Sequence, residues 1–124
     1  MIPERERLPR DRSAITRKLV IIGDDGADID IYVTVGLYDD GRPGEVFIRV
    51  AKQGSALSGM AESVSILLSM ALQHGTPLSA LTGKLKGIAF EPAGMTRNDP
   101  EKRITVSIID YVAHWLEQRF PGKP

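Results

Sequence analysis

The chain has 124 residues, 16 basic and 16 acidic side chains, and no cysteine. Its length fits a single domain that can bury a core without covalent cross-links. A net charge of zero gives no general attraction to nucleic acid or to anionic lipid, so neither is an expected partner. Without cysteine, this chain can form no disulfide, thiol nucleophile or zinc–thiolate site.

Residues 1–14 are rich in charge and proline and contain no apolar stretch of the signal-peptide type. This composition predicts an extended arm ahead of one domain over residues 15–120 and a short tail over 121–124. Two interpretations of the arm stay open: a solvated, loosely docked terminus, or a basic segment that grips a partner. No apolar run is long enough for a bilayer, so we expect a soluble, cytoplasmic protein.

Three strands are expected in the first half of the chain. Residues 15–22 are rich in β-branched side chains and end at a Gly-Asp-Asp-Gly turn. Apolar residues then alternate with polar ones over 29–37 and again over 46–50, around a turn that contains Asp-Gly and Pro-Gly pairs. The pattern predicts a three-stranded antiparallel meander with one buried face.

After Gly54 the apolar period changes from two to about 3.6, which predicts helices. The first has Ser55 as its N-cap and ends at Gly75, with an apolar stripe of Leu57, Met60, Ala61, Val64, Leu67, Leu68, Ala71 and Leu72. A short helix follows, with Thr76 as its cap and Pro77 at its first position.

Residues 88–102 are expected to be irregular, and a last helix is expected over 103–120. Its predicted buried side is Ile104, Ile108, Tyr111, Val112, Trp115 and Leu116. Strands first and helices after predict an α+β fold, with three helices (one short) packed on one face of the sheet.

No catalytic or metal-binding constellation is predicted. The two histidines, His74 and His114, have no partner at position i+4, and no Ser-His-Asp pattern is present. The acidic residues between 24 and 30 lack the spacing and the terminal glutamate of an EF-hand loop. We therefore expect structural histidines, a solvated acidic turn and no enzymatic activity from this chain by itself.

Two segments are candidates for binding. At the predicted strand-to-helix turn, Lys52, Gly54 and Ser55 would offer free N–H groups and a positive charge to an anion, and Gly59 would allow close approach. The turn is not a P-loop, because the G-x-x-x-x-G-K-[ST] pattern is absent. The irregular segment is long for a compact domain and carries a mixed set of polar side chains, namely Glu91, Thr96, Arg97 and Arg103.

The order and spacing of several motifs resemble one family. They are Ser13-Ala14-Ile15-Thr16-Arg17-Lys18, Tyr32 to Glu45 (YVTVGLYDDGRPGE), Ala51-Lys52-Gln53-Gly54-Ser55, Ala71-Leu72-Gln73-His74-Gly75-Thr76-Pro77-Leu78, Phe90-Glu91-Pro92 and Ser107-Ile108-Ile109-Asp110-Tyr111. Together they resemble the TSCPD-type domain near the C-terminus of cobalamin-dependent (class II) ribonucleotide reductases. Two positions depart from the family pattern: Arg17 stands where the family usually has histidine, and Leu85 where it has an aromatic residue.

The resemblance implies a free-standing, non-catalytic accessory domain that binds a reductase chain or a second copy of itself. The family's cobalamin and nucleotide sites belong to a catalytic barrel outside this chain, so no cofactor is expected here. The alternative hypothesis is a small nucleotide- or phosphate-binding module that uses the turn from Lys52 to Ser55.

Overall fold

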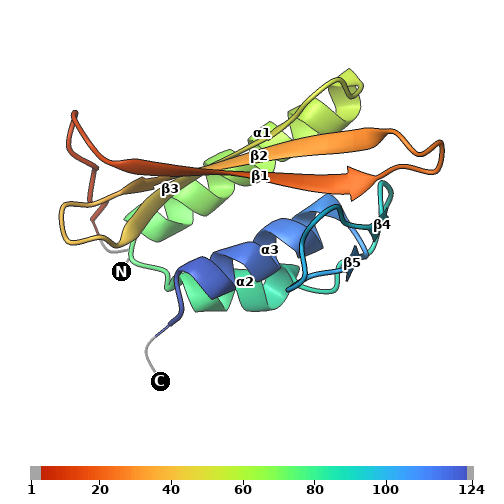
Figure 1. Cartoon of the computed structure of the whole chain (residues 1–124). Helices are drawn as coiled ribbons and strands as arrows, with labels where there is room; N and C mark the ends of the chain where they lie inside the picture. Colours follow the sequence, from red (N-terminus) through yellow and green to blue (C-terminus); the bar gives the residue numbers. More distant parts are fainter. Residues whose placement is uncertain (1–3, 123–124) are drawn as a thin grey trace.

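A computed structural model of the chain describes residues 4–122. Three strands form an antiparallel meander in the order β1-β2-β3, with β1 at Ala14–Ile22, β2 at Asp28–Leu37 and β3 at Pro43–Val50. Three helices follow, α1 at Ser55–Gln73, α2 at Leu78–Leu85 and α3 at Ile108–Arg119. In Figure 1, α2 and α3 lie below the sheet and α1 passes behind it. The expected α+β architecture is therefore confirmed.

The alternating pattern places the core as expected. The inward residues of all three strands are buried and pack against α3, whose Tyr111 and Leu116 are almost fully enclosed. The inward strand residues are Leu19, Ile21, Ile31, Val33, Val35, Val46, Ile48 and Val50. On the opposite face of the sheet, outward side chains such as Thr16 and Phe47 are exposed.

Helix α1 lies along the outer edge of β3, where it takes the place of a fourth strand. The Ser65 hydroxyl accepts the Ile48 N–H (2.8 Å), and the Ser69 hydroxyl accepts the Val46 N–H (2.9 Å). One turn further, the Gln73 side-chain amide donates to the Gly44 carbonyl (2.9 Å). Four helical residues rise about 6 Å and two strand residues about 6.6 Å. Every fourth residue of α1 therefore lies opposite every second residue of β3.

This arrangement corrects the expected burial of α1. Met60 and Leu67, assigned to the buried stripe, are 65% and 70% exposed, whereas Ser65 and Gln73 are buried. The reason is the strand edge, because its free N–H and C=O groups need polar partners and so draw a polar stripe of the helix inward.

Other corrections concern helix starts. Gly54 and Pro77, rather than Ser55 and Thr76, occupy the N-cap positions of α1 and α2. The last helix begins at Ile108 instead of 103, because the Ser107 hydroxyl caps it by accepting the Asp110 N–H (2.9 Å). The preceding Ile104–Thr105 forms β5, paired with β4 at Gly94–Met95. Ile104, expected on the buried side of the helix, is exposed instead.

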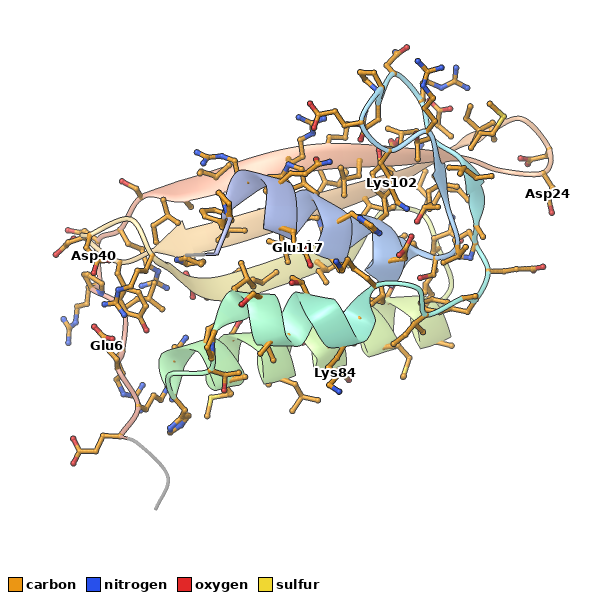
Figure 2. All side chains as sticks on the ribbon, turned by 90° about the horizontal axis from the view of Figure 1, so that it is seen from below. Glu6, Asp24, Asp40, Lys84, Lys102 and Glu117 are labelled. Carbon is orange, nitrogen blue, oxygen red and sulfur yellow. The ribbon has the colours of Figure 1, made fainter. Side chains whose placement is uncertain are left out.

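The described part of the N-terminal arm is docked on the domain. The Glu6 carbonyl accepts a hydrogen bond from the Tyr38 hydroxyl (2.5 Å), and the Glu6 carboxylate pairs with Arg42 (2.9 Å). Further along, Arg12 pairs with Glu45 (2.6 Å), directly above Gly36, where any side chain would collide with that carboxylate. These contacts fix the arm against the β2–β3 turn; Figure 2 shows Glu6 and Asp40 together at this end.

Replacing Ser65 with alanine tests the edge contact. The substitution leaves the Ile48 N–H buried without an acceptor, so we expect the free energy of unfolding to fall by about 1–2 kcal/mol in urea denaturation. Ser58→Ala, at an exposed position of the same helix, is the control and should change it by less than about 0.5 kcal/mol. Equal effects of the two substitutions would contradict the role given to Ser65.

Candidate partner-binding surface

The two segments singled out from the sequence lie at the same end of the molecule (Figure 1). The turn between β3 and α1 faces the β1–β2 turn across a shared hollow, which Lys52 and Asp28 both line. On the other side of that turn, Arg97 pairs with the Asp28 carboxylate (2.7 Å). The fold therefore joins the strand-to-helix turn, the acidic turn and the long loop into one rim.

The turn from Lys52 to Ser55 is exposed, and its surroundings are acidic. Lys52 adopts a left-handed backbone conformation (φ 59°), and no side chain caps the first turn of α1. The hollow beside it is lined by four aspartates: Asp24, Asp25, Asp28 and Asp30. Two of the four carboxylates are paired with cations, Asp28 with Arg97 (2.7 Å) and Asp30 with Lys18 (3.8 Å), so the hollow carries mixed charge. Anion binding at this turn stays a prediction. Gly59, one turn further, is exposed on α1.

The long loop is anchored by two of its four candidate residues. Thr96 is buried, forms a bridge with Ile21 and donates from its hydroxyl to the Lys102 carbonyl. Arg97 donates its backbone N–H to the Val20 carbonyl (3.1 Å) in addition to pairing with Asp28. Glu91 and Arg103 are exposed. Thr96 and Arg97 therefore hold the loop on the edge of β1, and the other two are free to face a partner.

An apolar surface follows this loop, and we call it the hairpin patch. Met95 on β4 and Ile104 on β5 are opposite one another and are 63% and 64% exposed. Outside this ladder, Phe90 donates its backbone N–H to the Val106 carbonyl (3.0 Å) and so joins the start of the loop to the segment after β5. The patch consists of five exposed apolar side chains: Ile88, Phe90, Met95, Ile104 and Val106. Exposed apolar side chains gathered in one segment make this surface a candidate for contact with another molecule.

Asp110, in the first turn of α3, fixes the hairpin patch to the rest of the domain. Its buried carboxylate accepts hydrogen bonds from the Gly87 N–H (2.8 Å) and the Thr105 hydroxyl (2.8 Å). It also pairs with the Lys102 ammonium (3.1 Å) and lies 3.3 Å from the His114 ring. Figure 2 shows Lys102 beside α3. One side chain thus ties α3 to the end of α2 and to both flanks of the hairpin.

The protonation of Asp110 is set by this network. Burial works to raise the pKa of the carboxyl, but the Gly87 N–H, the Thr105 hydroxyl and the Lys102 ammonium together outweigh it and lower the pKa to about 2. The neighbouring Tyr111 shows the opposite direction, since burial and its hydrogen bond to Asp99 raise the pKa of its hydroxyl. Asp110 is therefore a charged, structural residue near neutral pH.

Asp110 lies four residues before His114, so the two side chains share one face of α3. The sequence pattern considered above covers only residues four positions after each histidine and therefore does not include this pair. No group of three or more His, Asp or Glu side chains suited to a metal ion is found within residues 4–122. The sequence also missed the hairpin patch, although Ile104 and Val106 alternate around buried Thr105 and carry a weak strand signal.

The chain is a small α+β domain with a buried structural carboxylate and several exposed apolar side chains. Residues 3–120 match the TSCPD domain family, so the chain belongs to that family. The resemblance seen in the motifs is thereby confirmed.

The relatives are large enzymes. The chain is 46% identical over 114 residues to a vitamin B12-dependent ribonucleotide reductase of Rhodopirellula baltica, covering 92% of this chain and 10% of that protein. It is 44% identical over 118 residues to the enzyme of the same description in Streptomyces avermitilis, covering 95% of this chain and 12% of the relative. The chain thus spans about a tenth of these relatives. No solved structure matches it.

Asp110→Asn tests the carboxylate network. The folded pKa of about 2 lies below the usual value of 3.8, so Asp110 stabilises the fold fully above about pH 5 and loses that contribution as pH falls from about 4 to 2. We expect the asparagine variant to lose on the order of 2 kcal/mol at pH 7 and to show a flatter acid dependence of the free energy of unfolding.

The matched control is Asp24→Asn, in the exposed β1–β2 turn. It should change the free energy of unfolding by less than about 0.5 kcal/mol and leave the loss of stability at low pH as it is in the native protein. If Asp110→Asn loses stability at low pH as steeply as the native protein, other carboxyl groups govern the acid sensitivity.

Proposed function

We propose that this chain is a non-catalytic, ribonucleotide-reductase-type accessory domain that acts by binding a reductase chain. The observation that carries the proposal is the hairpin patch, a set of apolar side chains held outward by a rigid network. Similarity to one segment of vitamin B12-dependent reductases supports the choice of partner. The cobalamin named in those relatives would be bound by the partner and not by this chain.

The geometry supports an apolar docking contact with a polar rim. Met95 and Ile104 form the centre of the patch, and Glu91 and Arg103 lie in the same loop beside it. Apolar centres surrounded by charged residues are the usual anatomy of protein interfaces. Because Asp110 and Thr96 fix the loop, little conformational entropy is lost on binding.

Affinity capture from the source cell's lysate, with mass spectrometry of the bound chains at low and high salt, tests the partner. We expect a ribonucleotide reductase chain to be recovered at both salt concentrations, because apolar contacts are weakly screened. The double variant Met95→Ser/Ile104→Ser should reduce recovery at least about tenfold, which corresponds to about 1.4 kcal/mol.

Leu67→Ser, at an exposed apolar position on α1 outside the patch, is the matched control and should recover as much reductase as the native chain. If no reductase chain is captured by the folded native protein at either salt concentration, the proposal is wrong. Capture that both variants retain would place the contact elsewhere on the domain.

A further inference from the structure

The outer face of α1 is a second apolar surface, separate from the hairpin patch. Four of its large side chains are exposed: Met60, Ile66, Leu67 and Met70. Across all 19 residues, Glu62 is the only charged side chain of this helix. A helix face in contact with water normally carries several charges. By length and hydropathy alone α1 could cross a membrane, which corrects the expectation that no apolar run is long enough for a bilayer.

The polar side of α1 is already used. Ser65, Ser69 and Gln73 bond to the edge of β3, so the helix cannot turn its apolar face inward without leaving those strand groups unpaired. The exposed apolar face is therefore a fixed consequence of the fold and not an accident of side-chain placement.

The face is self-complementary about Ser63. Its outward positions are three, four and seven residues to either side of Ser63: 56, 59 and 60 before it, and 66, 67 and 70 after it. The first half carries the small residues Ala56 and Gly59, and the second half carries the bulky residues Leu67 and Met70. In an antiparallel pair related by a two-fold axis at Ser63, Gly59 faces Leu67 and Ala56 faces Met70 of the other helix, while Met60 faces Ile66.

We propose that this face binds a second copy of the chain, with the two α1 helices antiparallel and Ser63 at the two-fold axis. Glu62 lies to one side of the face, so pairing buries no charge at the centre of the contact. A bilayer is a poorer occupant, because α1 carries no lysine or arginine for lipid headgroups.

The size of the contact sets the expected strength. Helix α1 is about 28 Å long, and one apolar face of that length offers a few hundred Å² per copy. That falls at the small end of specific interfaces, below the roughly 800 Å² per partner of stable complexes. The dimer is therefore weak and depends on protein concentration.

Sedimentation equilibrium of the native protein between about 1 μM and 1 mM tests the dimer. We expect the average mass to rise from monomer toward dimer over this range, and Leu67→Glu to stay monomeric because each dimer would gain two buried charges. The control Ile104→Glu, in the hairpin patch, should dimerise like the native protein. Circular dichroism confirms that each variant is folded.

Cross-linking tests the position of the axis, and the cysteine-free chain makes it unambiguous. Under mild oxidation, Ser63→Cys should form an intermolecular disulfide, because residues on a two-fold axis face their own copies. Ser79→Cys, exposed on α2, should not.

The inference is overturned if the native protein is monomeric at all concentrations. It is also overturned if Leu67→Glu dimerises equally, or if Ser63→Cys cross-links no faster than Ser79→Cys. Sedimentation of a monomeric native protein with neutral phosphatidylcholine vesicles would assign the face to a membrane surface instead. None of these outcomes depends on reductase binding, which the Met95→Ser/Ile104→Ser variant reports separately.

Discussion

The free edge of β3 is the constraint on which most of this structure depends. A three-stranded sheet leaves unpaired N–H and C=O groups along its outer strands, and these must be bonded when they are covered. Here the hydroxyls of Ser65 and Ser69 bond to one edge, while the loop at Thr96 bridges β1 at the other. Once α1 is fixed by its polar stripe, its apolar residues are divided between the core and the outer surface. The exposed face at Leu67 is thus a result of how the sheet ends.

The hairpin patch depends on a second polar device. Met95 and Ile104 stay exposed because their short strands are fixed to α3 on the buried side. The Asp110 carboxylate makes this connection through Thr105 and Lys102. Both apolar surfaces of the domain are therefore supported by buried polar side chains. For the docking function that we propose, these buried polar contacts would keep the scaffold in shape whether or not a partner covers the apolar residues.

How far the sequence predicts this structure depends on the kind of pattern. Strict alternation around Val33 and Val46 predicts the hairpin and its buried face, because a strand has only two sides. The 3.6-residue period of α1 predicts a helix but assigns Leu67 to the wrong side, since the usual rule that apolar residues are buried fails at a strand edge. The sequence pattern assigns Ile104 to the last helix. That assignment is wrong because Ser107 caps α3 at Ile108, and Ile104 lies in β5 before the cap.

The sequence singles out the segment that carries the hairpin patch but not the residues of the patch. The long loop containing Arg97 was expected to carry binding residues, and its neighbourhood does hold the hairpin patch. The turn at Lys52 was chosen from local chemistry alone, and the acidic residues facing it come from a turn more than twenty residues earlier. The role of Asp110 is not apparent in the sequence, because the four partners named for its carboxylate come from three separate segments that only the folded chain brings together.

Gln73 has a mechanical consequence. Its side-chain oxygen accepts a hydrogen bond from Arg5 (2.6 Å), its backbone carbonyl accepts the Glu6 N–H (2.8 Å), and its amide nitrogen holds Gly44. Tension applied to the N-terminal arm therefore passes through the hydrogen bonds of Gln73 to the last turn of α1 and to the start of β3. A pull on the arm would load the helix and the strand together, instead of peeling the arm away alone.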